Sequence, residues 1–186
     1  FDRRVLYYLG HEMTNKNLKI KAFWASYKYF YCAFNYPNLG IKIVPLAVSG
    51  ICLDRKGFTI IAIRENVTEY SNRKELVPSG GISELPTTDY LIDFRRQLLE
   101  ELFEEASVNA ENILSVKEIG LVRDLSSQVM DICCQIDLGD IAEVRPVPNE
   151  EYSSMRTTHI SDLNRNELAP TSRGILDIIC KNRNSL

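Results

Sequence analysis

An acidic helix between runs of β-branched residues narrows the folds open to this chain of 186 residues. From residue 89 to residue 106, apolar side chains recur at helical spacing, with Leu91, Leu98 and Leu102 on one side. Strands are predicted from apolar runs before and after this helix, at residues 41–53, 58–63, 75–77, 113–122, 129–138 and 154–160. Residues 54–57, between the first two runs, predict a hairpin turn. Strands on both sides of a central helix predict an α/β domain whose layers surround a mixed sheet.

The two ends of the chain carry further predicted segments. Residues 22–36 hold eight aromatic side chains and predict a strand or a hairpin, whose rings form a core or a dimer surface rather than a base-stacking platform. Near the other end, Thr171 or Ser172 caps a closing helix. We expect residues 1–40 to form a small aromatic-rich extension of the same globule, and residues 41–186 to form the main domain.

Charge and cysteine content limit the partners and the location. The net charge of −3 gives no electrostatic reason to expect nucleic acid or a membrane surface as a partner. Five cysteines, an odd number without CxxC spacing, indicate a reducing compartment, so we expect a cytoplasmic protein, either monomeric or homodimeric. No apolar run reaches transmembrane length, and no signal-peptide pattern opens the chain. Because the chain starts at Phe1 rather than Met, we expect residues upstream.

Four carboxylates crowd two turns of the predicted helix, at Glu100, Glu101, Glu104 and Glu105. No Lys or Arg lies between Gln97 and the next predicted strand, so like-charged pairs at i+3 and i+4 each cost roughly 0.2–0.5 kcal/mol. A plain solvated helix face is the alternative interpretation, although such a face would normally interleave basic residues. A divalent cation is the simplest compensation. Glu101, Glu104 and Glu105 project from one face, and their oxygen ligands suit Mg²⁺ or Mn²⁺.

A metal of this kind also indicates the class of substrate. Mg²⁺ usually keeps several waters and completes its coordination with substrate phosphates. Gly81, the second of two adjacent glycines upstream, leaves room for a backbone carbonyl to approach the ion. The pattern therefore predicts phosphate or pyrophosphate chemistry.

The residues that frame this helix follow a known box. Gly81 matches its opening glycine, residues 101–105 match Glu-U-x-Glu-Glu, where U is aliphatic, and Val108 matches a further aliphatic position. Glu84 matches the extended form Gly-Gly-x-x-Glu. In these features the chain resembles the Nudix hydrolases, over roughly residues 43–138. The resemblance implies a Nudix-type α/β/α sandwich around a mixed sheet.

Three departures from the box bear on activity. Glu100 stands where the family has Arg, and Ser107 stands where it has Gly. The interval after Gly81 is about five residues longer than usual, so the isolated glutamate of the box has no clear equivalent, Asp89 and Asp93 being the candidates. In the family, the arginine orients a catalytic carboxylate through an ion pair, which glutamate cannot do. A Nudix-like nucleotide-binding domain without turnover is therefore one alternative.

The resemblance also implies a substrate. Extended boxes without the arginine occur in Nudix proteins that cleave UDP-glucose and UDP-galactose, and residues 119–124 and 167–174 are similar to that subgroup. This implies Mg²⁺-dependent hydrolysis of the pyrophosphate bond of a nucleoside diphosphate linked to X, with a UDP-sugar giving UMP and a sugar 1-phosphate. The alternatives within the family are ADP-ribose, coenzyme A and dinucleotides.

Each candidate residue then has an expected role. The catalytic residues are Glu101, Glu104 and Glu105, and the metal ligands are the same three together with Gly81. The substrate-binding residues are Arg64, Glu84 and Arg123, and the general base is Glu101 or one of the later pair Glu150 and Glu151. The alternatives are a surface cation for Arg64, a local ion pair or turn for Arg123, and ordinary loop charges for Glu150 and Glu151.

Overall fold

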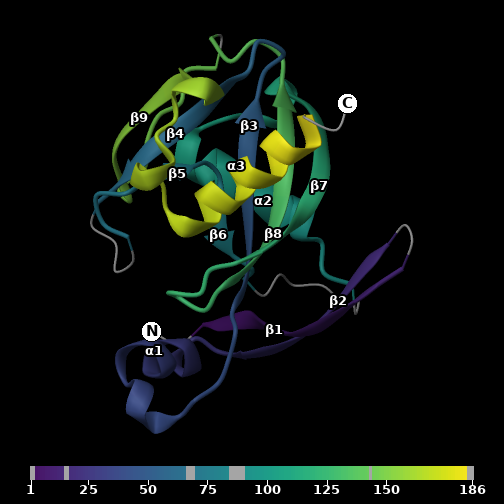
Figure 1. The fold of residues 1–186 in the computed structure, drawn as a ribbon, viewed down its shortest axis with the longest axis vertical. Coiled ribbons are helices and arrows are strands. Elements are labelled where there is room, and N and C mark those ends of the chain that lie inside the picture. Colours follow the sequence, from purple (N-terminus) through teal and green to yellow (C-terminus); the bar gives the residue numbers. More distant parts are fainter. Residues whose placement is uncertain (1–2, 15–16, 66–69, 84–90, 143, 184–186) are drawn as a thin grey trace.

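The computed structural model describes residues 3–14, 17–65, 70–83, 91–142 and 144–183 (Figure 1). In chain order, its strands and helices are β1 (Arg4–Met13), β2 (Leu18–Ser26), α1 (Lys28–Asn35), η1 (Pro37–Leu39), β3 (Leu46–Leu53), β4 (Phe58–Arg64), β5 (Lys74–Leu76), β6 (Ser79–Gly81), α2 (Phe94–Ala106), η2 (Ala110–Asn112), β7 (Ile113–Arg123), β8 (Met130–Leu138), β9 (Tyr152–His159), η3 (Ile160–Asp162), η4 (Arg165–Glu167) and α3 (Pro170–Arg183). Each strand predicted after residue 40 is present, although the first begins at Leu46. In the described part of the chain, no helix combines the length and the apolar character that a membrane crossing requires.

The strands of the main domain form two sheets. Four of them form a mixed sheet in the order β6-β3-β8-β7, in which β3 and β8 are parallel. The other three form an antiparallel sheet in the order β5-β4-β9. Because β3 and β4 lie in different sheets, the hairpin predicted at residues 54–57 is wrong as a strand pairing. The turn itself is present, since Asp54 Oδ1 accepts from the backbone N–H groups of Lys56 and Phe58 at 2.8 and 2.9 Å. Beyond this turn, β4 pairs with β5 and β9 instead of β3.

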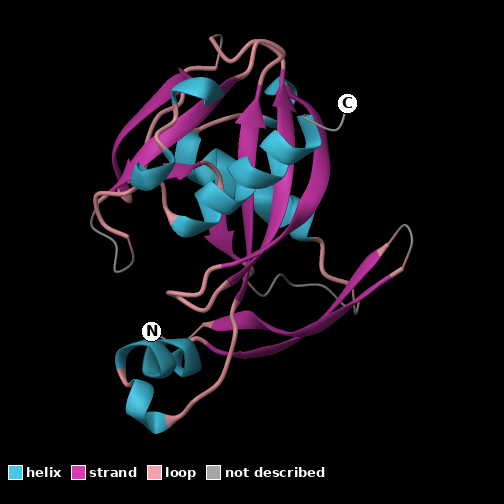
Figure 2. Cartoon of the chain, viewed as in Figure 1, coloured by secondary structure: helices cyan, strands magenta, loops and turns pink. Residues whose placement is uncertain are grey.

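Two helices cover opposite faces of the mixed sheet, with α3 in front of it and α2 behind it (Figures 1 and 2). Along β3, Val48 and Cys52 belong to a core cluster with the apolar side of α2, whereas Ile51 and Leu53 belong to a cluster with α3. Successive side chains of a strand point to opposite faces, so burial on both faces explains why β3 is apolar along its length. The predicted α/β/α sandwich around a mixed sheet is confirmed.

The N-terminal residues form a two-stranded sheet of β1 and β2, followed by α1 (Figure 1). The strand or hairpin predicted over residues 22–36 is therefore wrong beyond Ser26, where the chain becomes helical. Along this helix, the ring of Phe30 lies between those of Tyr27 and Phe34, with centroids 5.7 and 5.9 Å away. Side-chain contacts at i+3 and i+4 thus override the strand preference of aromatic residues.

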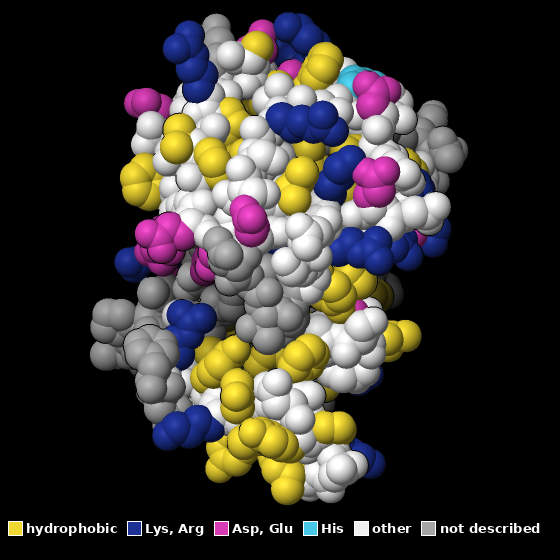
Figure 3. All heavy atoms as spheres, turned by 90° about the vertical axis from the view of Figure 1, so that its left-hand side faces the viewer, with side chains coloured by type: hydrophobic (Ala, Val, Ile, Leu, Met, Phe, Trp, Pro, Cys, Tyr) yellow, Lys and Arg dark blue, Asp and Glu magenta, His cyan; other side chains and the backbone are white. Residues whose placement is uncertain are grey.

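The aromatic rings of this segment lie at the surface. α1 has no buried residue, so the prediction that its rings form a core is wrong for the helix. Large exposed apolar side chains of the extension include Leu9, Met13, Tyr29, Tyr31, Phe34, Tyr36 and Leu39. Figure 3 shows hydrophobic side chains gathered over this lower part of the molecule. The dimer surface stays a prediction, as does the division of the chain at residue 40.

β1 attaches the extension to the main domain. Tyr7 is fully buried, and its phenol donates to the Ser26 carbonyl at 2.9 Å and accepts from the Phe30 N–H at 3.2 Å. The backbone N–H of Tyr8 donates to the Val44 carbonyl at 2.7 Å. The Tyr7 side chain therefore organises the extension internally, and backbone hydrogen bonds from Leu6 and Tyr8 hold β1 beside the main domain.

The closing helix differs from its prediction at its start. α3 begins at Pro170, a residue type that suits the first helical position because its missing N–H has no helical partner there. Thr171 and Ser172 lie within the helix, so their predicted role as caps is wrong. The Thr171 hydroxyl donates to Asp131 at 2.9 Å, and the Ser172 hydroxyl accepts from the Leu76 N–H at 2.9 Å. These hydroxyls tie α3 to both sheets.

Candidate active site

The acidic helix α2 begins with two local polar contacts. Asp93 caps it, because its carboxylate accepts from the Arg96 N–H at 3.1 Å. Arg96 Nε in turn lies 2.8 Å from a carboxylate oxygen of Glu100, one turn further on. The expectation that Glu100 is uncompensated is therefore wrong, since its partner stands just before Gln97. The unbalanced charge of the helix is confined to the glutamates beyond Glu100.

Glu101 is half-buried between α2 and β6. The Gln97 side chain donates to its Oε1 at 2.8 Å from one turn earlier. A Cβ placed on Gly80 would lie only 2.2 Å from the Glu101 carboxyl carbon, so this position accepts glycine alone unless the carboxylate moves. Burial raises the pKa of Glu101, and the charges of Glu104 and Glu151 raise it further, against the hydrogen bond from Gln97. Gln97 thus orients Glu101.

Glu105 is buried one turn beyond Glu101. Its Oε2 accepts from the Ser79 N–H at 3.0 Å, and its Oε1 accepts from the Tyr152 hydroxyl at 2.8 Å. Burial raises the pKa of Glu105 well above its ordinary value, and the charge of Glu75 raises it further. α2 is consequently joined to β6 and β9 through one carboxyl group.

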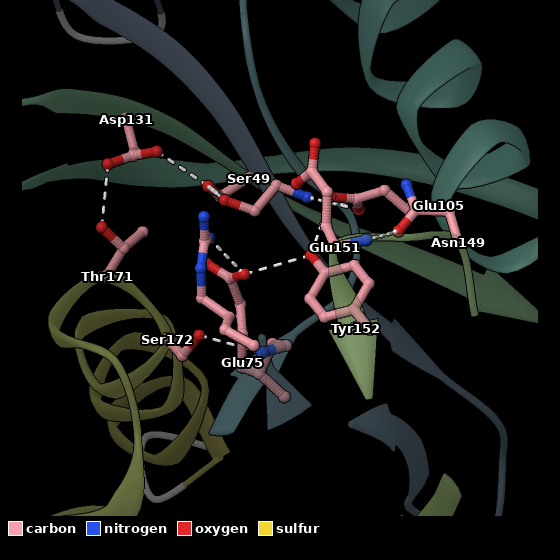
Figure 4. A network of polar contacts seen from close by, with 12 residues as sticks. Ser49, Glu75, Glu105, Asp131, Asn149, Glu151, Tyr152, Thr171 and Ser172 are labelled. Carbon is pink, nitrogen blue, oxygen red and sulfur yellow. Dashed lines mark hydrogen bonds and ion pairs between the residues drawn. The ribbon is translucent and has the colours of Figure 1, made fainter. Parts of the chain in front are cut away.

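Tyr152 links this carboxyl group to a second one (Figure 4). Its hydroxyl also lies 3.1 Å from Glu75 Oε2, which pairs with Arg64 Nη1 at 2.5 Å. A phenol carries a single proton and can donate fully to only one of two carboxylates. The Tyr152 hydroxyl lies within hydrogen-bond distance of both carboxyl groups and therefore bridges Glu105 and Glu75. The four side chains form one buried network.

A pocket of about 210 Å³ adjoins this network. Its lining comes from both parts of the chain and comprises Arg3, Val5, Tyr27, Phe30, Pro45, Leu46, Ala47, Arg64, Tyr70, Glu75, Ser79, Gly80, Gly81, Asp124, Ser127, Val129, Asp131, Ala169 and Thr171. Asp131 is buried and accepts from Ser49 at 2.7 Å and from Thr171 at 2.9 Å (Figure 4). Burial raises the pKa of Asp131 to about 6. The pocket therefore has carboxylates and two arginines in its wall.

No protein-family model matches the sequence, and no curated protein matches it. Solved structures do match. The bifunctional NMN adenylyltransferase/ADP ribose pyrophosphatase from Francisella tularensis superposes with a TM-score of 0.61 at 13% identity, over 83% of this chain and 46% of that one. The NUDIX domain of Shewanella oneidensis NrtR, complexed with ADP ribose, superposes with a TM-score of 0.60 at 16% identity, over 82% and 96%. The MutT protein from Methanosarcina mazei gives 0.56 at 14%, over 75% and 95%.

This chain has the Nudix fold. It spans less than half of the Francisella protein but nearly the whole of the Shewanella domain. Identities this low establish the fold alone. In this Nudix fold, α2 carries residues 101–105 of the box match, and β6 carries Gly80 and Gly81.

The structure brings together some of the predicted site residues and separates others. Arg64 and Gly81 line the pocket, although the charge of Arg64 already faces Glu75. Arg123 is exposed and donates to Gln128 at 2.8 Å, outside the lining of that pocket. Glu84 and Asp89 lie outside the described residues.

The two later candidates for a general base lie on the loop before β9. Glu150 and Glu151 are both exposed. Glu151 is near enough for its charge to raise the pKa of Glu101, and no such effect links Glu150 to that residue. Glu151 is thus the better placed of the two.

A divalent cation is the group that the resemblance implies here. Among the described residues, no three Asp, Glu, His or Cys side chains come close enough together to hold one. Glu104 is exposed, and Glu105 is engaged by Ser79 and Tyr152. The donor chemistry does fit a hard cation, because the Glu101 carboxylate fills the space that the missing Cβ of Gly80 leaves, within reach of two further negative charges. The full ligand set stays a prediction.

Sequence reasoning missed several residues of this site. Asp131 could have been recognised, because it is an acidic residue near the start of the apolar strand β8, and a buried carboxylate needs hydrogen-bond partners. Gln97, one turn before Glu101, was also visible as a helical neighbour. Tyr152 and Glu75 carried no signal, because their contact depends on how the two sheets meet.

Proposed function

We propose that this protein is a Nudix hydrolase that uses Mg²⁺ or Mn²⁺ to hydrolyse the pyrophosphate bond of a nucleoside diphosphate linked to X. The proposed substrate is a UDP-sugar, which gives UMP and a sugar 1-phosphate. The main support is the position of Glu101 and Glu105, which α2 holds against the backbone of β6 next to a polar pocket.

The residues of the chain divide the proposed chemistry between them. Glu101, Glu104, Glu105 and the Gly81 carbonyl would hold the metal, which supplies charge neutralisation at the pyrophosphate and acidifies a water when bound. Gln97 keeps the Glu101 carboxylate in its orientation.

Two further roles belong to residues near the pocket. Arg64 would face a phosphate oxygen from the wall of the pocket, with its guanidinium held in place by Glu75. Glu151 is the proposed general base, because its charge reaches Glu101 from an exposed loop where a water can approach. We place the enzyme in a reducing, cytoplasmic compartment, with support from its five unpaired cysteines.

ADP-ribose is the second candidate substrate. Of the similar structures, the Francisella protein is an ADP ribose pyrophosphatase in one of its two activities, and the Shewanella domain is complexed with ADP ribose. A binding domain without turnover is the third candidate. It is favoured because Glu100, which stands where the family has its arginine, pairs with Arg96.

A nucleotide panel with product identification separates these candidates. The purified protein is incubated with UDP-glucose, UDP-galactose and ADP-ribose in Mg²⁺, in Mn²⁺ and in EDTA, and the products are separated by chromatography. We expect UMP and sugar 1-phosphate from a UDP-sugar, and no product in EDTA. Release of AMP and ribose 5-phosphate alone would select ADP-ribose, and binding without product would select the third candidate.

Matched variants test the site. Glu101→Gln and Glu105→Gln should each lower turnover by at least about a hundredfold, as expected for groups that act on the reacting centre. Glu111→Gln is the control, because Glu111 is an exposed glutamate of η2. Turnover by both site variants at the rate of the control would refute the proposed site.

A further inference from the structure

The pocket is too small for a whole nucleotide sugar. Its volume of about 210 Å³ lies below the roughly 300–1,000 Å³ of pockets that enclose drug-sized ligands. It can therefore take one ring of a larger substrate. Gly80 and Gly81 lie in its lining, so the pocket adjoins the candidate active site.

Asp131 is an acceptor in this lining that two other elements hold in place. Its side chain starts from β8, and hydroxyl groups of β3 and α3 each donate to one of its oxygens. Each carboxylate oxygen can accept a second hydrogen bond, so both retain capacity toward a ligand. Three elements fix the orientation of Asp131, whose exposed fraction is only 3%.

The other polar groups of the lining narrow the ligand chemistry. Asp124 and Glu75 are also carboxylates, so a phosphate group enclosed by this pocket would meet three carboxyl groups, whereas one at its Arg64 wall would meet a guanidinium. A lone ammonium group would instead face the guanidinium groups of Arg64 and Arg3. A neutral ring with several hydroxyl groups can donate to the carboxylates and accept from the arginines.

The wall contributed by the N-terminal extension suits the same ligand. Tyr27 and Phe30 line the pocket, and their ring centroids are 5.7 Å apart. Aromatic faces provide apolar contact for a ring whose edge is polar. A sugar ring has this division, with C–H groups on its faces and hydroxyl groups around its edge.

We infer that this pocket binds the sugar ring on the far side of the pyrophosphate, with Asp131 as the acceptor for its hydroxyl groups. The inference rests on the proposed function, because it names the part of that substrate that the pocket selects. It makes Asp131 a residue that determines specificity, separate from the glutamates of α2.

The test compares sugar nucleotides with their parent diphosphates. Binding of UDP-glucose, UDP, ADP-ribose and ADP is measured by calorimetry in EDTA, which prevents metal-dependent turnover. We expect at least one sugar nucleotide to bind the full chain more tightly than its parent diphosphate. Asp131→Asn should remove at least about tenfold of that preference, since a hydrogen bond to a charged group is lost, and should leave the parent diphosphate unaffected.

Two variants keep the comparison interpretable. Asp137→Asn makes the same change on the same strand outside the pocket, and it should keep the preference. Thr171→Val removes one hydroxyl that holds Asp131 and should also reduce the preference. It replaces Asp131→Asn as the test if circular dichroism shows that Asp131→Asn does not fold.

The outcomes separate this inference from the proposed function. The inference is overturned if each sugar nucleotide binds only as tightly as its parent diphosphate, or if Asp131→Asn weakens the sugar nucleotide and its parent equally. Hydrolysis can still occur in either case. Absence of product with a preference that depends on Asp131 overturns only the proposed function. Tighter binding of UDP-glucosamine than of UDP-glucose, lost in Asp131→Asn, would replace the hydroxyl acceptor with an ammonium site.

Discussion

Asp131→Asn should change how the stability of the protein depends on pH. Burial raises the pKa of Asp131 from its ordinary 3.8 to about 6. The folded state therefore holds this proton at pH values where the unfolded state has lost it, so Asp131 lowers stability progressively as pH rises from about 4 to 6. Each pKa unit corresponds to about 1.4 kcal/mol, which gives a penalty of about 3 kcal/mol above pH 6. Asparagine does not ionise and escapes this penalty.

Urea unfolding of the wild type and of Asp131→Asn at pH 4.0 and pH 7.5 measures the effect. The difference in unfolding free energy should shift in favour of the variant by about 2–3 kcal/mol between the two pH values. Other titrating groups are common to both proteins and cancel in the comparison. Asp137→Asn, on the same strand but outside the pocket, is the matched control. A difference between wild type and variant that is the same at both pH values would refute the argument that burial of Asp131 costs stability.

Two further substitutions test the contacts around α2. Gly80→Ala should lower turnover by at least about tenfold, because its Cβ would lie 2.2 Å from the Glu101 carboxyl carbon and displace it, whereas Gly139→Ala meets nothing within 4 Å and should keep full activity. A Gly80→Ala protein as active as Gly139→Ala would show that Glu101 needs no fixed position. Tyr152→Phe should lower the unfolding free energy by about 1–3 kcal/mol, because two buried carboxyl groups lose a partner. Tyr29→Phe, at an exposed ring, should change it little, and equal urea midpoints for the two variants would contradict the bridging role.

The architecture of the main domain could be predicted because its signals are local. The acidic helix and the apolar runs of β3 and β8 each show a pattern of apolar residues that can be read from that segment of the sequence alone. β6 was missed because two of its three residues are glycines, which are rare in strands. The missing side chain of Gly80 is what leaves room for the carboxylate of Glu101.

Contacts between distant segments could not be predicted in the same way. The turn after β3 was recognisable from Asp54 and Gly57, but the choice of β9 rather than β3 as the partner of β4 is made by tertiary packing. Residues 28–35 have the composition of a strand and form a helix, because their rings contact one another along it. The glutamates of the candidate site share one helix and could be proposed from their spacing, whereas Tyr152 and Asp131 lie on β9 and β8, in different sheets.

The buried phenol of Tyr7 has a practical consequence for anyone who trims this protein. It joins β1 to the start of α1, and the same segment supplies Arg3, Tyr27 and Phe30 to the pocket wall. Deleting residues 1–40 to obtain a smaller protein would remove this part of the pocket wall. Conversely, exchanging that segment would change the shape of the pocket without altering any residue of α2.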